Sequence, residues 1–190
     1  MALKLVSGPT EEPVSLDEAK IQCRVDISDD NALITSLITE ARQMVEEMAR
    51  RALITQTWRL SLDRWPACDY ISLPLPPLQS VESLVYLDQE GNETTWDSSN
   101  YIADLDSEPG RLVLGYNKVW PSTTLYPVNP IQITFKAGYG DDAANVPELW
   151  KRAIKLMVGH WYENREAAIS GTILRDIPLG VQSLIWLDRG

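Results

Sequence analysis

The sequence has few of the side chains that bind metals or form disulfides. Among its 190 residues are two cysteines, Cys23 and Cys68, and one histidine, His160. The cysteines lie far apart and neither belongs to a C-x-x-C pair, which is typical of a protein kept reduced in the cytosol. Because a zinc site needs several His or Cys ligands, we expect no bound metal and no cofactor. His160 falls beside an apolar helical stripe, where a lone histidine is more often a hydrogen-bonded core residue than a catalyst.

Long hydrophobic runs and common catalytic motifs are also missing. No stretch approaches the roughly 18 apolar residues that a membrane-spanning helix needs. The N-terminal residues lack the basic start and apolar run of a secretory signal, so we expect a soluble protein with no membrane partner. The motifs G-x-S-x-G, G-x-x-x-x-G-K-[ST] and G-x-G-x-x-G do not occur. The sequence therefore gives no indication of a serine hydrolase or of one of the usual phosphate-binding loops.

Basic residues are outnumbered by acidic ones. The chain has 17 Lys and Arg against 27 Asp and Glu, a net charge of −10, and residues 61–146 alone carry −8. Phosphate binding requires neutralisation by Lys and Arg, so the chain is a poor candidate for wrapping nucleic acid. The charge either keeps the protein soluble or forms an acidic surface to which a polyanion does not stick.

The first part of the chain, residues 15–53, has the signals of two helices. Ser15 and Glu18 have the spacing of a capping box, which predicts a short helix over about 16–24. Asp29-Asp30-Asn31 offers a second N-cap, and apolar residues then follow at helical spacing between positions 33 and 48. We predict a second, amphipathic helix that runs to about Leu53.

Residues 55–136 change to the period of β-strands. Apolar and polar residues alternate over 58–62 and again over 131–136, and Gly91 lies in a turn between two strand-like runs. Several short antiparallel strands with frequent turns predict a β-rich insertion of sandwich-like or small barrel-like form.

Helical period returns near the end of the chain. Pro147 leads a long apolar stripe, which predicts a helix over 147–166, and residues 171–190 form a tail with a short terminal helix. The sequence therefore predicts a single α+β domain over 1–190. Its mainly helical core, made of the N-terminal helices and the long C-terminal helix, carries the antiparallel β-rich insertion.

Acidic side chains gather at two predicted turns, residues 88–93 and 104–108. Paired carboxylates can act as acid and base or bind calcium. Their spacing does not match an EF-hand loop, and carboxylates in turns are ordinarily solvated. We expect no catalytic residue, no metal site and no enzymatic activity.

Tryptophan is the most distinctive residue type, with seven copies. Trp65, Trp96 and Trp120 adjoin turns, where an indole is harder to bury within one subunit, and we predict them, with Tyr139, to be subunit-interface residues. Local packing under the loops explains these side chains equally well. Trp186, near the C-terminus, is the best interface candidate of the seven.

Short motifs in a characteristic order extend over most of the chain. They are Val14-Ser15-Leu16-Asp17-Glu18-Ala19-Lys20, Asp29-Asp30, Gln56-Thr57-Trp58, Leu62-Asp63-Arg64-Trp65-Pro66, Leu75-Pro76-Pro77-Leu78-Gln79-Ser80-Val81, Lys136-Ala137-Gly138-Tyr139-Gly140, the Pro147-led helix ending in His160-Trp161-Tyr162-Glu163-Asn164-Arg165-Glu166, and Ile177-Pro178-Leu179-Gly180-Val181. Their order and spacing together resemble those of the head–tail connector (adaptor) family of long-tailed double-stranded DNA bacteriophages.

The resemblance implies a structural role without catalysis. It implies a ring, usually of twelve copies, bound beneath the portal protein in the virion neck after assembly in the host cytoplasm. Such rings extend the DNA channel, pass double-stranded DNA without sequence-specific binding and provide a docking surface for a stopper or tail completion protein. By similarity, portal contacts are expected in the C-terminal segment, at Ile177, Pro178, Leu184, Ile185, Trp186, Leu187 and Arg189.

A closed ring needs two different contact patches on each subunit, which the helical zone and the β insertion can supply. Part of the acidic β insertion would then line the lumen. Two alternatives come from other classes of protein. One is a non-catalytic ligand- or carbohydrate-binding module with an aromatic and acidic β surface, and the other is a hydrolase that uses the turn carboxylates.

Overall fold

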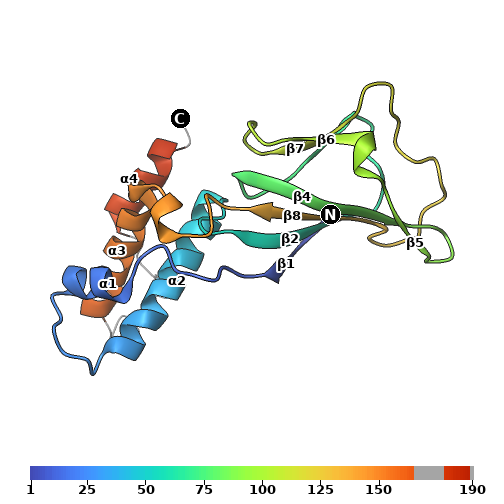
Figure 1. Ribbon diagram of the computed structural model, residues 1–190. Coiled ribbons are helices and arrows are strands. Elements are labelled where there is room, and N and C mark those ends of the chain that lie inside the picture. The colour runs from blue at the N-terminus through green and yellow to red at the C-terminus, as the bar shows by residue number, and fades with distance from the viewer. Residues whose placement is uncertain (165–177, 189–190) are drawn as a thin grey trace. The chain divides into compact units, whose positions relative to one another are not determined.

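The computed structural model describes residues 1–164 and 178–188 (Figure 1). It divides the chain into two compact units, one formed by Met1–Thr10 and Arg50–Tyr139, the other by Glu11–Ala49 and the described residues from Gly140 onward. The β-strands lie in the first unit and the α-helices in the second. None of the described helices combines the length and the apolar composition that crossing a membrane requires.

Two antiparallel sheets form the β unit. The five-stranded sheet has the order β1-β2-β8-β4-β5 and the three-stranded sheet the order β3-β7-β6. The strands span Ala2–Ser7 (β1), Gln56–Leu62 (β2), Tyr70–Ser72 (β3), Leu78–Leu87 (β4), Glu93–Thr95 (β5), Tyr101–Asp104 (β6), Arg111–Leu114 (β7) and Ile131–Ala137 (β8). A short 3-10 helix at Ser98–Asn100 connects β5 to β6.

One hydrophobic core joins the two sheets. Every second residue of β8, from Ile131 to Ala137, is buried, because side chains alternate between the two faces of a strand. These residues cluster with Leu60 of β2, Leu84 of β4 and Leu112 of β7, all fully buried. Since Leu112 belongs to the three-stranded sheet and the others to the five-stranded one, the sheets share this core as a sandwich does.

Four α-helices form the second unit: α1 (Leu16–Cys23), α2 (Asn31–Ala49), α3 (Glu148–Glu163) and α4 (Leu179–Asp188). Helix α3 packs against the other three. The buried residues of α2 and α3 recur every three or four positions, as an amphipathic helix requires; they include Ile34, Ile38, Ala41, Val45, Trp150, Ala153, Ile154, Met157 and Val158.

The predicted capping box of α1 is confirmed. The Ser15 hydroxyl accepts a hydrogen bond from the Glu18 backbone N–H at 3.2 Å, and the Glu18 carboxylate accepts one from the Ser15 N–H at 2.9 Å. The backbone hydrogen bond from Ser15 holds the pKa of Glu18 below its usual value. Two of the orphan N–H groups at the helix start are thereby satisfied.

The mixed α+β architecture is as predicted, and the structure differs in its details. Residues 2–7 form strand β1, which the sequence pattern did not reveal, so the β unit is built from both sides of the first two helices rather than from one insertion. Helix α2 ends at Ala49 rather than near Leu53. Arg50 takes a left-handed conformation, with φ of 56°, which an α-helix cannot continue through.

Candidate functional site

Three of the predicted interface residues meet in one aromatic cluster. The rings of Trp65 and Trp120 are stacked, with centroids 5.1 Å apart and planes 11° from parallel. Trp96 completes the cluster at 5.8 Å from Trp65 and 5.4 Å from Trp120, and Tyr86 and Tyr101 extend it. These residues come from segments far apart in the sequence and pack against the shared core of the two sheets.

The cluster members are half-buried; the rings of Trp65 and Trp120 are stacked, and the Trp96 ring is tilted against both. The Trp120 indole N–H donates to the Cys68 carbonyl at 2.9 Å. The Trp65 indole N–H is buried and has no hydrogen-bond partner within the described chain. Burial of the Tyr101 phenol raises its pKa. The cluster fixes three loops to the β unit, and the stacked faces of Trp65 and Trp120 are not available to a ligand.

Tyr139, the fourth predicted interface residue, lies away from the aromatic cluster. Its hydroxyl accepts a hydrogen bond from Arg51 at 3.4 Å, and Arg51 also donates to Glu108 at 2.5 Å. The hydrogen bond from Arg51 lowers the pKa of Glu108. The preceding residue, Gly138, has φ of +133°, and a Cβ there would lie 2.6 Å from the Ile54 backbone. Glycine is therefore required at this turn for steric reasons.

The turn carboxylates hold their own turns together. The Asp88 carboxylate accepts hydrogen bonds from the side chain and the backbone N–H of Asn92, and these lower its pKa. The Asp104 carboxylate accepts hydrogen bonds from the Ser107 hydroxyl and the Arg111 guanidinium, which lower its pKa to about 2. Within the described residues no cluster of His, Cys, Asp or Glu could hold a metal ion. The arrangement stabilises turns rather than preparing an acid and a base.

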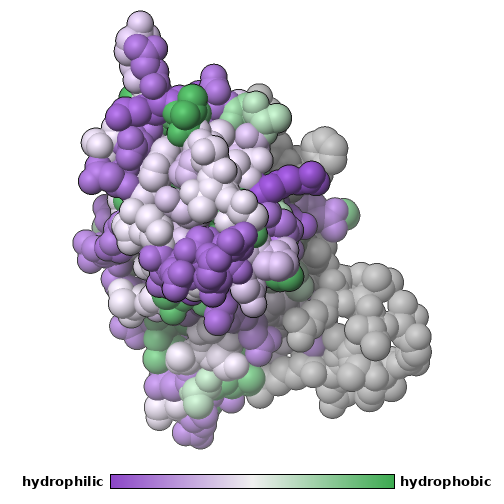
Figure 2. Space-filling view, turned by 90° about the vertical axis from the view of Figure 1, so that its right-hand side faces the viewer, coloured by the Kyte–Doolittle hydropathy of each residue, from purple (hydrophilic) through white to green (hydrophobic). Residues whose placement is uncertain are grey.

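The outer face of the five-stranded sheet is not acidic. Strand register places the side chains of Lys4, Arg59 and Thr134 in one row across β1, β2 and β8, and Lys136 lies two residues further along β8. Thr57, Ser61 and Gln132 also lie on this face, with Val85 of β4 opposite Gln132, and the Glu82 carboxylate of β4 forms an ion pair with Lys136 at 3.5 Å. The acidic groups of the unit lie mainly at the turns. In Figure 2, hydrophobic residues form separate spots on a mainly hydrophilic and neutral surface.

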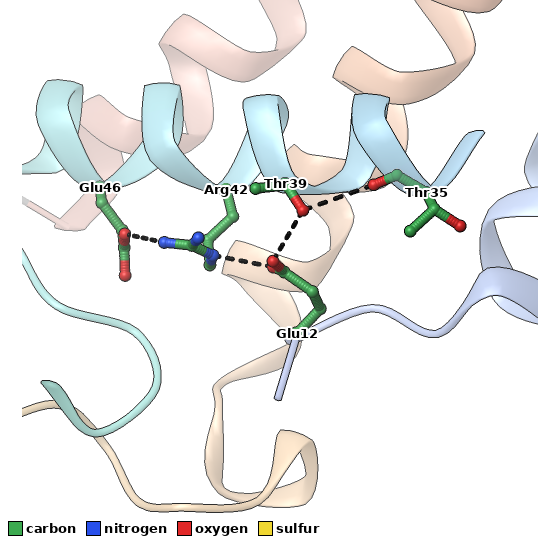
Figure 3. A network of polar contacts seen from close by, with 5 residues as sticks. All are labelled: Glu12, Thr35, Thr39, Arg42 and Glu46. Atoms are coloured by element: carbon green, nitrogen blue, oxygen red, sulfur yellow. Dashed lines mark hydrogen bonds and ion pairs between the residues drawn. The ribbon is translucent and has the colours of Figure 1, made fainter. Parts of the chain in front are cut away.

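A charged network anchors the first residues of the helical unit to α2 (Figure 3). Arg42, only 6% exposed, donates to Glu12 at 2.8 Å and to Glu46 at 2.7 Å. The Thr39 hydroxyl donates to the other oxygen of Glu12 at 2.9 Å. The sequence pattern did not reveal this network, because Glu12 and Arg42 lie 30 positions apart.

The expected portal-docking residues lie in and beside α4. Ile185 is 4% exposed and packs within its own unit together with fully buried Val181. Leu184 and Pro178 are half-buried, whereas Leu179 is 80% exposed. Ile177 and Arg189, and the side chains of Trp186 and Leu187, lie outside the described residues.

His160 has a structural environment in α3. Its carbonyl oxygen accepts hydrogen bonds from both the backbone and the side-chain N–H groups of Asn164, at 3.1 and 2.8 Å, which close the helix C-terminus. The His160 ring nitrogen Nδ1 lies 3.4 Å from the Asn164 amide nitrogen. These contacts close the C-terminus of α3, and a core role for the His160 side chain stays a prediction.

Several solved structures share this fold. One is a chain of the virion of a native gene transfer agent (GTA) particle, with a TM-score of 0.80 and 23% identity over 98% of this chain and 94% of that chain. Another, from the neck of an empty GTA particle computed with C6 symmetry, has a TM-score of 0.81 and 24% identity over the same shares. A third, from the neck of the native particle computed with C12 symmetry, has a TM-score of 0.76 and 24% identity, again over 98% and 94%. A search among curated proteins gave no match.

Family assignment rests on the sequence itself. The family model for phage gp6-like head–tail connector proteins matches residues 13–107, half of the chain. The matched segment starts at the capping region of α1 and ends in the turn that Asp104 stabilises. This chain therefore belongs to the phage gp6-like head–tail connector family.

Proposed function

We propose that this connector works as a ring of identical subunits, twelve in the particle, in the neck of a tailed virion, between the portal and the tail. One observation carries the proposal: a chain of the connector family shares its fold over almost its whole length with a chain from the neck of a native GTA particle computed with C12 symmetry. The ring extends the DNA channel and provides the docking surface for a stopper or tail completion protein.

The proposed role is structural and involves no catalysis. The turn carboxylates are held by hydrogen bonds from their own turns, and the Trp65, Trp96 and Trp120 rings pack against one another in one cluster. Both observations weigh against the hydrolase and against a carbohydrate-binding module, because each of those functions needs carboxylates or ring faces that remain available to a ligand.

Double-stranded DNA passes through the proposed ring without sequence-specific binding. The net charge of −10 supports this, because each phosphate that a cation neutralises adds affinity through counterion release. We propose that acidic turns of the β unit line the channel. The proposal requires that the outer face of the five-stranded sheet, with Arg59 and Lys136, points away from the DNA.

Portal docking is proposed for the C-terminal segment, residues 171–190, together with the helical unit as the core that presents it. Ile177, Pro178, Leu184, Trp186, Leu187 and Arg189 are the proposed contact residues, and Ile185 supports them from within the unit, since it is 4% exposed. Exposed Leu179, at the start of α4, adds an apolar side chain to the proposed docking segment. An exposed apolar residue on a docking helix is a typical interface anchor.

Electron microscopy of the protein mixed with its portal tests the proposal. The expected images show a closed ring bound coaxially to the portal, and a monomer that never joins the portal would refute the function. Deleting residues 177–190 would remove buried Val181 and Ile185 and so confuse folding with docking. Leu179→Asp is therefore the better variant: portal binding should fall at least tenfold with an unchanged melting temperature. Leu33→Asp on α2, at a residue 37% exposed, is the matched control that should bind normally.

A further inference from the structure

Strand β1 is an exposed edge with apolar side chains. All six of its residues are exposed, and it is the terminal strand of the five-stranded sheet. Leu3 and Leu5 lie in register with Leu60 and Trp58 of β2, on the sheet face that forms the core. Yet Leu3 is 36% and Leu5 43% exposed, whereas Leu60 is fully buried. The apolar face of this sheet therefore extends beyond the part that the three-stranded sheet covers.

An uncovered edge strand is a template for pairing with another strand. Its outward backbone N–H and C=O groups have no sheet partner, and proteins normally protect such an edge with charges, bulges or a covering segment. Here Lys4 and a register shift between Leu5 and Ser7 provide limited protection. Lys4 and the register shift disfavour pairing of β1 with unrelated strands, but they leave an edge that a strand of complementary side chains can pair with.

The three-stranded sheet offers a second edge of different character. Strand β6 is its terminal strand, and Ile102 within it is 62% exposed, followed by Leu105 at 45%. Ile102 lies in register with Val113 of β7, and Val113 with Tyr70 of β3, so an apolar row crosses the outer face of this sheet. Apolar surface thus reaches the β6 edge as it does the β1 edge.

The two edges are also complementary in charge. Lys4 on β1 and its cross-strand neighbour Arg59 are cationic, and neither has an ion-pair partner among the described residues. Asp106 follows the end of β6, is exposed and likewise has no ion-pair partner in the described chain. By contrast, the nearby carboxylate of Asp104 is already paired with Arg111. An apolar strand edge with a cation therefore matches an apolar strand edge with an anion.

We propose that the β1 edge of one subunit pairs with the β6 edge of the next copy of this chain. The pairing joins the five-stranded sheet of one subunit to the three-stranded sheet of its neighbour. Because the two edges differ, the contact is heterologous and propagates from head to tail, which is the kind of contact that a cyclic ring requires. The inference rests on the proposed ring and names the surfaces that close it.

Cysteine cross-linking tests the pairing directly. In a Cys23→Ser, Cys68→Ser background, Leu3→Cys or Leu5→Cys is combined with Ile102→Cys, since paired residues on adjacent strands have Cβ atoms within disulfide range. Oxidation of assembled rings should give a ladder of covalent oligomers in denaturing gels. Leu3→Cys combined with Thr94→Cys, on the opposite edge strand β5, is the matched control and should give no ladder.

A charge swap provides the second measurement. Lys4→Glu and Asp106→Lys should each raise the concentration for half-maximal ring assembly about tenfold, and the double variant should restore assembly. The β1–β6 pairing would be overturned if rings form but neither Leu3→Cys nor Leu5→Cys gives cross-linked oligomers with Ile102→Cys. It would also be overturned if the effects of Lys4→Glu and Asp106→Lys on assembly are additive in the double variant. Either result would leave the proposed function standing. If the unmodified chain forms no ring even with the portal present, the proposed function itself fails.

Discussion

Arg42 should be among the most sensitive positions of the helical unit. Its side chain is 7% exposed and lies between two carboxylates, Glu12 at 28% and Glu46 at 12% side-chain exposure. Arg42→Met keeps much of the apolar volume but removes the guanidinium that both carboxylates bind. Removing one partner of a buried ion pair costs about 3–5 kcal/mol, because the remaining charge stays desolvated.

We expect the lower end of this range, about 3 kcal/mol, because Glu12 keeps access to water and can turn toward it. For a chain of this size each kcal/mol lowers the melting temperature by roughly 2–4 °C, so the expected decrease is about 6–12 °C. Urea unfolding followed by far-ultraviolet circular dichroism measures the free energy of unfolding, and a melting curve measures the temperature.

The cause of this loss of stability is tested by also neutralising the Glu12 and Glu46 carboxylates. Adding Glu12→Gln and Glu46→Gln to Arg42→Met should recover at least about 1 kcal/mol, because neutral amides cost less to bury than carboxylates. Arg152→Met, at an exposed position of α3, is the matched control and should change the free energy of unfolding by less than about 0.5 kcal/mol. A loss below about 1 kcal/mol for Arg42→Met, or no recovery in the triple variant, would refute the reasoning.

Three further predictions concern the β unit and α3. Gly138→Ala should lower the free energy of unfolding, measured by urea titration, by about 2 kcal/mol or more, because φ is +133° and the added Cβ meets the Ile54 backbone at 2.6 Å. Gly159→Ala in α3 is the control. Its new Cβ meets the Gln22 side chain at 3.4 Å, so the free energy of unfolding should stay unchanged or rise slightly. Trp65→Ala should cost about 3–5 kcal/mol in thermal unfolding because it opens the centre of the aromatic cluster, and an effect below about 1 kcal/mol would show that the cluster is not a packed unit. The pKa of Asp104 falls from 3.8 to about 2 on folding, so its carboxylate contributes stability that is present above pH 4 and is lost as the pH falls toward 2. Asp104→Asn should therefore make the free energy of unfolding depend less on pH between 4 and 2. An unchanged pH dependence in this range would contradict the lowered pKa of Asp104.

Local patterns in the sequence were enough to predict much of the fold. The capping box of α1, the amphipathic stripes of α2 and α3 and the alternation of β8 all depend on residues within a few positions of one another. Helix and strand periods are therefore visible without knowledge of contacts. The predicted end of α2 was less accurate. The helix ends because Arg50 takes a left-handed conformation, and arginine has no strong preference for that conformation.

The family, too, was accessible from the sequence, because its motifs are ordered along the chain and the matching family model spans residues 13–107. The turn carboxylates illustrate the limit. Sequence shows that Asp88 and Asp104 gather near other acids, but only the folded turns show that Asn92, Ser107 and Arg111 occupy their oxygens. A carboxylate bound in this way stabilises its turn, whereas the same residue left open could have been a candidate base.

The sequence by itself determined the α+β class, the helices, the main alternating strands and membership of the connector family, because each depends on local periodicity or on motif order. Only the tertiary structure decided that residues 2–7 become an edge strand, that the rings of Trp65, Trp96 and Trp120 meet in one cluster, and that Arg42 meets Glu12. The physical reason is the same in all three cases. Strand pairing, ring stacking and buried ion pairs are contacts between segments distant in the chain, and a sequence pattern records which groups are present but not which of them folding brings together.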